Sequence, residues 1–305
     1  MSRLLERITS PAIRERLDAR CRERPEVQTL LYIMWYPTIL EWVHSVGVCT
    51  DARLAALVPP FPPLQLRNIV AAPEIMSFLW TGVRDLAQVI ELYEEHRSAH
   101  DPTRPAILDF GCGCGRMTRF LNDYPDQWEV HASDVNRPAV EWCRRNLRGV
   151  QTVANGVDPP LPFADGRFNL VYTASIFTHL PEPRATAWLA ELRRVLAPSG
   201  ILIVTTHGIP ALEIMKGSKE HQELFRMDDA AVGDLLARLP AEPYVFLRYA
   251  EVGLRLAQAG EEYGNAFIHP DYVRQRWASA QLELVQHLPG GARGWQDVIV
   301  FRRRS

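Results

Sequence analysis

The spacing of hydrophobic and polar positions changes near residue 105. Before it, apolar residues recur three or four positions apart, as in the stretch from Glu74 to His96, which predicts amphipathic helices. After it, short apolar runs alternate with amphipathic stretches, an order typical of a parallel sheet with connecting helices. The pattern predicts a helical N-terminal extension or cap over residues 1–104 and an α/β domain over residues 105–305.

The N-terminal region shows no strand pattern. Residues 4–20 and 27–46 are predicted helices, and the proline-rich segment 57–66 is predicted to be a linker or a wrapped loop. Three aromatic residues of the second helix are expected to pack in an interior, with an acceptor platform or a homodimer seam as the alternatives; they are Trp35, Tyr36 and Trp42.

The elements of the α/β region can be placed from the same pattern. Strands are predicted at residues 106–110, 129–133, 151–154, 170–173 and 200–206, and helices at 115–122, 137–146 and 183–196. Residues 208–270 are longer than a simple crossover needs, so this irregular-to-helical stretch is predicted to be a lid insertion. A helix from Asp271 and two strands, at 282–286 and 297–302, are predicted to complete the chain.

Composition narrows the class of protein. The chain has 305 residues, 47% hydrophobic and 23% charged, which is typical of globular proteins. The formal charge of −2 disfavours nucleic acid as a partner, and no apolar run is long enough for a membrane span. The odd cysteine count and the charged N-terminal residues predict a reducing, cytoplasmic location without export.

The strongest chemical signal is a glycine turn after the first predicted strand. Residues 107–116 read ILDFGCGCGR, with glycines at 111, 113 and 115, which let a backbone approach a ligand closely. A dinucleotide fingerprint would have its third glycine at position 116, where this chain has arginine. Asp109 is poorly placed for a pyrophosphate, but well placed for a ligand that carries an ammonium group.

A second acid, Asp134, stands at the end of the next predicted strand. A carboxylate at this position can accept both hydroxyl groups of a ribose. Taken together, the two acids and the glycine turn indicate a nucleoside that has an amino-acid tail and no phosphate.

With these motifs, the sequence resembles the class I S-adenosylmethionine-dependent methyltransferases. It is most similar to a bacterial small-molecule group that shares the DFGCGCGR run (109–116), PLPFADG (160–166) and FTHL (177–180). The resemblance is strong over residues 105–208, and it implies a Rossmann-like α/β fold. In that fold a seven-stranded, mostly parallel sheet has an antiparallel last strand.

The resemblance also implies S-adenosylmethionine as cofactor and S-adenosylhomocysteine as product; no metal is predicted, because Thr205, Thr206 and His207 after the fifth strand offer no acidic ligands. The residues it assigns to the cofactor are Asp109, Gly111, Cys112, Gly113, Gly115, Asp134, Val135, Asn155, Gly156 and Ser175. The chain departs from the family at Asn169, where aspartate is common, and this side chain is expected to face the surface.

Two histidines are candidates for the chemical step. His179 and His207 follow the fourth and fifth predicted strands, where the acceptor is expected, and either could act as a base or bind the acceptor. Arg248, Tyr263 and Gln296 are further candidates for acceptor contacts.

The sequence favours an enzyme that methylates a small molecule, at a hydroxyl of a sugar or natural product. The motif of DNA amino-methyltransferases, a cysteine nucleophile and a cluster of acidic metal ligands are all missing after the fourth and fifth strands. A Cys112–Cys114 metal site is disfavoured because no second cysteine pair accompanies it. A protein or RNA methyltransferase and a non-catalytic cofactor-binding partner remain the alternatives.

Overall fold

The computed structural model describes residues 60–121, 127–249 and 262–304. The predicted helices at 4–20 and 27–46, and the aromatic residues Trp35, Tyr36 and Trp42, lie outside the described residues. The division of the chain at residue 104 therefore stays a prediction.

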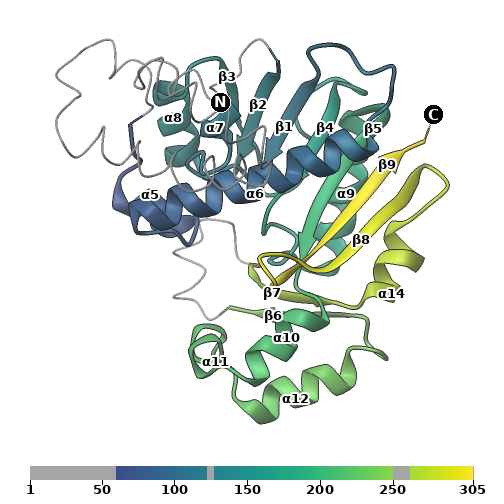
Figure 1. The fold of residues 1–305 in the computed structure, drawn as a ribbon. Coiled ribbons are helices and arrows are strands. Elements are labelled where there is room, and N and C mark those ends of the chain that lie inside the picture. The colour runs from purple at the N-terminus through teal and green to yellow at the C-terminus, as the bar shows by residue number, and fades with distance from the viewer. Residues whose placement is uncertain (1–59, 122–126, 250–261, 305) are drawn as a thin grey trace, which may run out of the picture.

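A seven-stranded sheet forms the centre of the molecule (Figure 1). Its strands are β1 (Ala106–Phe110), β2 (Glu129–Asp134), β3 (Val150–Ala154), β4 (Phe168–Thr173), β5 (Leu196–Thr206), β8 (Leu282–Ala292) and β9 (Gln296–Arg303). Their spatial order is β3-β2-β1-β4-β5-β9-β8. Of these seven strands only β9 runs antiparallel to the rest, between β5 and β8. The predicted fold class and the antiparallel last strand are confirmed.

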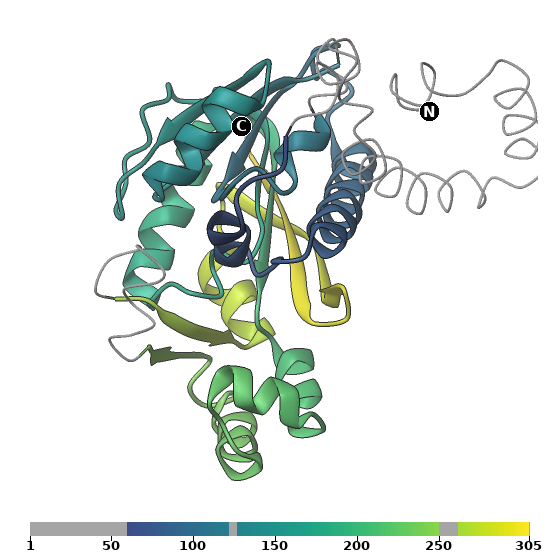
Figure 2. The same ribbon diagram turned by 90° about the vertical axis from the view of Figure 1, so that its left-hand side faces the viewer.

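Helices cover both faces of this sheet. The principal ones are α6 (Ile75–His96), which crosses the front of the sheet in Figure 1, and α9 (Glu182–Val195) behind it. Shorter helical pieces are α5 (Leu64–Ile69), α7 (Thr118–Leu121), α8 (Arg137–Asn146), α14 (Pro270–Tyr272) and the π-helical turn η2 (Val273–Trp277). The turned view in Figure 2 shows the sheet between its helical layers.

The strands are hydrophobic on both sides because both faces are covered. Every residue of β1 is buried. Ile107 packs in the cluster that includes α6, whereas its neighbour Leu108 packs in the cluster that includes α9. Successive side chains thus enter opposite layers, which explains the near-continuous apolar run of the sequence.

Local chemistry sets two of the helix boundaries. The side chain of Asn136 accepts a hydrogen bond from the Ala139 N–H at 3.0 Å and caps α8, which has the predicted bounds. The predicted helix at 115–122 is shorter in the structure. Gly115 has a φ of +77°, which a right-handed helix does not allow, and α7 begins only at Thr118.

Residues 208–270 contain a separate lobe next to the sheet, at the bottom of Figure 1. It consists of α10 (Ile209–Lys216), α11 (Lys219–Phe225), α12 (Asp229–Arg238) and a two-stranded antiparallel sheet of β6 (Tyr244–Arg248) and β7 (Gly264–Ile268). Its helical part was predicted as the lid, but its small sheet was not. Each of those strands is only five residues long, and residues 249–263 separate them, so no local turn marks the pair.

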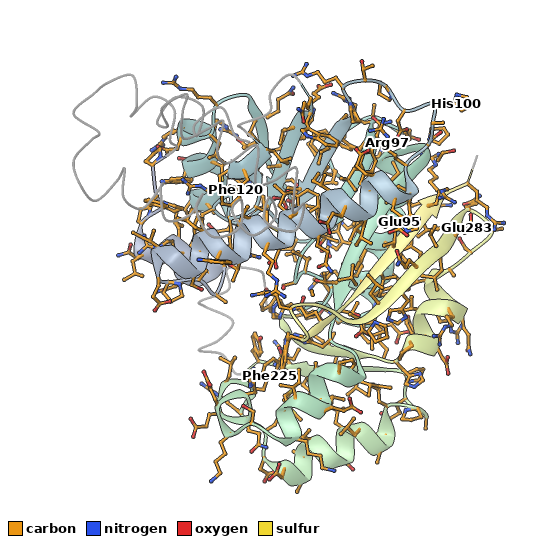
Figure 3. All side chains as sticks on the ribbon, viewed as in Figure 1. Glu95, Arg97, His100, Phe120, Phe225 and Glu283 are labelled. Carbon is orange, nitrogen blue, oxygen red and sulfur yellow. The ribbon has the colours of Figure 1, made fainter. Side chains whose placement is uncertain are left out.

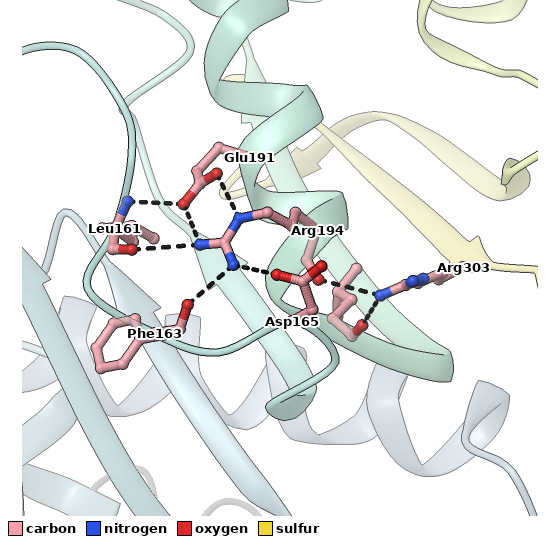
Figure 4. Close-up of polar contacts among 7 residues, drawn as sticks. Leu161, Phe163, Asp165, Glu191, Arg194 and Arg303 are labelled. Atoms are coloured by element: carbon pink, nitrogen blue, oxygen red, sulfur yellow. Dashed lines mark hydrogen bonds and ion pairs between the residues drawn. The ribbon is translucent and has the colours of Figure 1, made fainter.

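The 160–166 motif that carried part of the resemblance is held in place by α9 (Figure 4). Arg194 donates to the carbonyl oxygens of Leu161 and Phe163 at 3.2 and 2.9 Å, and it pairs with Asp165 at 2.5 Å. Glu191 accepts the Leu161 N–H at 2.6 Å and two bonds from Arg194. These contacts give the motif a structural role, because they fix the loop between β3 and β4.

Asn169 was expected to face the surface, but its side chain is half-buried and forms two hydrogen bonds. Its side-chain oxygen accepts the Ala106 N–H at 3.0 Å, and its amide donates to Asp101 at 3.3 Å. The half-buried side chain therefore ties the start of β1 to β4. An aspartate could accept the first bond but could not donate the second.

Within the residues that the structure describes, no helix has both the length and the apolar character that crossing a membrane requires.

Candidate functional site

A cavity of about 660 Å³ lies at the carboxyl ends of β1, β2, β4 and β5. Ligands of open α/β sheets bind at this edge, where successive loops leave the sheet on opposite sides. Residues from the lobe and from the turn between β8 and β9 complete the walls of the cavity. Of the residues predicted for the cofactor or the chemical step, all except Gly115 line it.

The glycine turn after β1 requires glycine for two reasons. Gly111, Gly113 and Gly115 all have positive φ, at +81°, +54° and +77°. A Cβ atom on Gly111 would come within 2.2 Å of Ile176, and one on Gly113 within 2.4 Å of Val70. The prediction named the ligand as the reason for these glycines, but the structure shows that protein side chains already fill the space of the missing Cβ atoms.

Asp134 is fixed by the backbone around it. One carboxylate oxygen accepts the Gly113 N–H and the other the Asn136 N–H, both at 2.7 Å. Burial raises the pKa of this carboxyl group, while the backbone hydrogen bonds act in the opposite direction. Each oxygen keeps lone-pair capacity for a hydroxyl donor, so the group fits a ribose diol.

Asp109 is buried at the end of β1, and the Thr118 hydroxyl donates to it at 2.5 Å. Burial raises the pKa of Asp109 to about 6, against the opposing effects of the Thr118 hydrogen bond and the positive charge of Arg116. A ligand ammonium group beside this carboxylate would restore its charged form. The residue therefore fits the amino-acid end of the cofactor.

Asn155, which the resemblance assigns to the cofactor, has an unused hydrogen-bond acceptor. The Asn155 amide donates to the Gly156 carbonyl oxygen at 2.7 Å, while the Asn155 side-chain oxygen is buried without a partner among the described residues. A buried acceptor without a partner is costly. An exocyclic amine such as that of adenine can donate to it, and Val135 lines the same part of the cavity.

Cys112 and Ser175 close the cavity floor. Cys112 is a free, buried thiol, as are Cys114 and Cys143. Ser175 has a φ of +61°, which is unusual for a residue other than glycine. Its N–H donates to the Thr205 hydroxyl at 2.7 Å, and its hydroxyl donates to Gln296 at 3.0 Å. This strained residue thus joins the end of β4 to β5 and β9.

His179 is held in one tautomer. Its Nδ1 lies 2.8 Å from the Gly264 carbonyl oxygen, which can only accept, so Nδ1 carries the proton. The ring stacks on Tyr263, with centroids 4.7 Å apart. Burial lowers the pKa of His179, and its Nε2 atom is left as an unprotonated acceptor.

His207 lies at the end of β5, 6.4 Å from His179 between ring centroids. It is 3% exposed, and its Nε2 lies 3.5 Å from the Gln296 amide nitrogen. Burial lowers its pKa to about 3, with a smaller contribution from His179. The ring is therefore neutral, and aromatic side chains surround it: Phe225, Phe267 and Trp295.

Of the three further acceptor candidates, Tyr263 and Gln296 line the cavity. Arg248 does not line it and is exposed at the end of β6.

Sequence reasoning missed several wall residues. From the lobe these are His221, Leu224, Phe225, Tyr249 and Asn265, and from the β8–β9 turn they are Arg293 and Trp295. Figure 3 shows Phe225 on the lobe where it approaches the sheet. The one available signal was the aromatic content of the predicted lid, since no local motif marks these positions.

A second missed part of the wall comes from the corner between α5 and α6. Ile69, Val70 and Ala71 line the cavity, and Val70 packs over Gly113. No element was predicted for this corner, which lies between the proline-rich segment and the helical pattern that starts at Glu74.

In the described ranges, no group of three or more histidine, cysteine, aspartate or glutamate side chains could hold a metal ion.

The family model described as "Methyltransferase domain" matches residues 107–200. Over 195 residues the chain is 27% identical to a malonyl-[acyl-carrier protein] O-methyltransferase of Halalkalibacterium halodurans, covering 60% of this chain and 69% of that protein. It is 31% identical over 118 residues to a fatty-acid O-methyltransferase of Mycolicibacterium smegmatis, covering 38% and 42% of the two chains. The chain thus spans less than half of the second relative.

Among solved structures, the chain is similar to the 1,6-didemethyltoxoflavin-N1-methyltransferase of Burkholderia thailandensis. The TM-score is 0.47 at 15% identity, and the match covers 81% of this chain and 95% of that one. The family match falls on the strands and the glycine turn that form the cavity floor. Residues 107–200 of this chain therefore match a methyltransferase domain.

Proposed function

We propose that the protein transfers the methyl group of S-adenosylmethionine to an oxygen atom of a small-molecule acceptor, a hydroxyl of a sugar or natural product. The observation that carries this proposal is the fixed tautomer of His179, a residue that lines the cavity and whose Nε2 is left unprotonated. A neutral hydroxyl must lose its proton during methyl transfer, and a positioned base assists that loss.

When bound, the cofactor supplies a methyl group on a positively charged sulfur. The chain's own residues bind and orient it: Asp109 at the ammonium group, Asp134 at the ribose and Asn155 at the adenine amine. The glycine turn and Ser175 shape the space between them. The acceptor would then lie beside the cofactor, against the cavity walls that the lobe contributes.

His179 is the proposed catalytic base. Its Nδ1–H donates to the Gly264 carbonyl oxygen, and stacking on Tyr263 restrains the ring. Because burial lowers its pKa, the ring is neutral at physiological pH and its Nε2 lone pair can take the acceptor proton.

His207 is proposed to shape and orient the acceptor side. Its pKa of about 3 makes it a weak base, and its Nε2 faces the Gln296 amide. Gln296 in turn accepts from Ser175, so the three side chains form a chain of contacts across the ends of β4, β5 and β9.

The named relatives support oxygen as the acceptor atom. The malonyl-[acyl-carrier protein] and fatty-acid enzymes are both O-methyltransferases by name, at 27% and 31% identity. The size of the cavity, about 660 Å³, also supports a small-molecule acceptor, and the described lobe residues form part of its walls.

The test uses S-adenosylmethionine labelled in its methyl group, the purified protein and an extract of the source organism. Small molecules, protein and nucleic acid are then separated. We expect the label among small molecules, in a form stable to mild base, because methyl ethers survive treatment that hydrolyses methyl esters.

Two variants complete the test. His179→Gln should abolish most labelling, while His100→Gln, a change at an exposed histidine far from the lobe (Figure 3), should leave it unchanged. Label in protein or nucleic acid would overturn the small-molecule acceptor. Label that mild base releases would show a methyl ester, and the acceptor group would then be a carboxyl group and not a hydroxyl.

A further inference from the structure

A cluster of two arginines and one aspartate lies at the edge of the cavity, outside the residues assigned above. Arg116 follows the glycine turn, Asp85 lies on α6, and Arg293 lies in the turn between β8 and β9. Both arginines line the cavity. We call these three residues the arginine corner.

The arginine corner holds more positive than negative charge. Arg116 Nη1 lies 2.8 Å from one carboxylate oxygen of Asp85, and Arg293 Nε lies 3.3 Å from the other. In the part of the chain that the structure describes, neither guanidinium has another carboxylate within ion-pair distance. Within the corner, one carboxylate thus serves two cations.

The charged groups of the arginine corner are only partly exposed to solvent. The side chains of Arg116 and Asp85 are 10% and 12% exposed, and that of Arg293 is 39% exposed. Burial lowers the pKa of Arg293, Asp85 opposes this change, and the charges of Arg116 and Arg84 add to it. An anion that enters the cavity would relieve the repulsion between these cations.

Arg293 occupies a turn position that arginine does not favour, so the need to form the turn does not explain this residue. Arg293 has a φ of +59° and Gly294 one of +78°, and the Trp295 N–H closes the turn on the Ala292 carbonyl oxygen at 3.0 Å. Turns with two positive φ values favour asparagine or glycine at the first position. The chain keeps an arginine at a strained position where its side chain reaches the cavity.

The turn is also fixed against α6. The Gln88 amide donates to the Gly291 carbonyl oxygen at 2.8 Å. Arg293 therefore approaches Asp85 and Arg116 from a turn that is anchored to the same helix. The corner is built from three separate segments of the chain.

The position of the arginine corner near Asp109 indicates which anion it could bind. Arg116 is close enough to Asp109 for its charge to lower the pKa of that carboxyl group. Asp109 is the proposed partner of the cofactor's ammonium group, and in an α-amino acid the ammonium and carboxylate groups share one carbon atom. A planar guanidinium matches a carboxylate in both charge and geometry.

We propose that Arg293, together with Arg116, binds the carboxylate of the cofactor's methionine portion, so that the turn between β8 and β9 contributes to the cofactor site. This inference rests on the proposed use of S-adenosylmethionine. An acceptor carboxylate offers the same chemistry, and the experiment separates the two sources.

The test is calorimetric binding of two probes, S-adenosylhomocysteine and its decarboxylated analogue, to the full-length protein. The variant is Arg293→Asn, because asparagine suits the left-handed turn and should preserve or raise the melting temperature. Arg148→Asn, at an exposed arginine outside the cavity lining, is the matched control.

We expect Arg293→Asn to weaken binding of S-adenosylhomocysteine by about tenfold or more, the effect of losing a charge-assisted contact, and to leave binding of the decarboxylated analogue unchanged. Arg293→Lys should restore part of the lost affinity. Equal weakening for both probes, or none for either, would overturn the proposal.

Unchanged binding of both probes with a raised KM for the acceptor would also overturn it, and would assign the corner to an acceptor carboxylate. Failure of the wild-type protein to bind either probe would instead contradict the proposed function itself.

Discussion

The two sides of the cavity differ in how the chain builds them. On the proposed cofactor side, β1, β2 and β3 lie next to each other, and Asp109, Asp134 and Asn155 each stand at or just after a strand end. On the acceptor side, His179, Phe225, Asn265 and Trp295 come from four separate segments. The residues of the first side can therefore be recognised from short sequence motifs. Those of the second side come together only when the chain folds.

The two sides carry different kinds of titratable group, a carboxyl group and imidazole rings, but burial favours the neutral form of both. It raises the pKa of Asp109 to about 6 and lowers that of His207 to about 3, so each group is moved toward its neutral form. On the cofactor side a charged ligand can reverse this effect. On the acceptor side neutral rings suit an uncharged nucleophile.

The largest expected effect tests the acceptor side. His179→Gln should lower kcat by about 10² to 10⁴, the contribution of a general base, without changing affinity for S-adenosylhomocysteine. In the wild-type protein, kcat/KM should rise with pH, with a midpoint below 6.5, because burial lowers the pKa of His179. A variant that keeps full turnover would assign this histidine a structural role.

The next effect tests the cofactor side. Asp134→Ala should weaken binding of S-adenosylhomocysteine by about 100-fold, because the ribose hydroxyls lose a charged acceptor, while the apo fold stays intact. Calorimetric titration measures the affinity, and thermal melting checks the fold. Asp234→Ala, at an exposed position on α12, is the control. Unchanged affinity would contradict the ribose assignment.

A third prediction concerns Asp109, where the same substitution should stabilise the apo protein and weaken cofactor binding. Its pKa of about 6 in the folded chain exceeds its ordinary value of 3.8, so its contribution to stability is fully present below pH 3.8 and is lost as the pH rises through 6. Asp109→Asn should remove this loss and stabilise the apo protein above pH 6, by on the order of 2–3 kcal/mol.

Denaturant unfolding at pH 4 and pH 7.5 measures this difference between Asp109→Asn and the wild type. The same variant should bind S-adenosylhomocysteine more weakly, since it lacks the charge for the ammonium group. Equal stability of the two proteins at pH 7.5 would show that burial does not penalise this carboxylate.

The smallest expected effect concerns His207. His207→Gln should lower kcat by up to about tenfold through misplacement of the acceptor, and the midpoint of the pH profile should not move. His207 is already neutral across the range in which His179 titrates, because its own pKa is about 3. A shift of the midpoint would instead make His207 the titrating group.

Much of the fold was predictable because its signals are local. The bounds of β1 and α8 agree with the prediction, since a buried strand and an asparagine-capped helix depend on neighbouring residues. The small sheet of β6 and β7 was not predictable, because its pairing depends on residues that are distant in the chain. Asn169 was placed on the surface for the same reason, since its partners Ala106 and Asp101 lie more than sixty residues away.

The candidate site divides along the same line. The sequence by itself determined the glycine turn, Asp109, Asp134 and the histidines after β4 and β5, because each is fixed by its position relative to one strand. Only the tertiary structure decided which tautomer His179 adopts, that Val70 and Ile176 fill the space above the glycines, and that Arg293 reaches Asp85. Those contacts join segments far apart in the chain, and packing rather than local spacing brings them together.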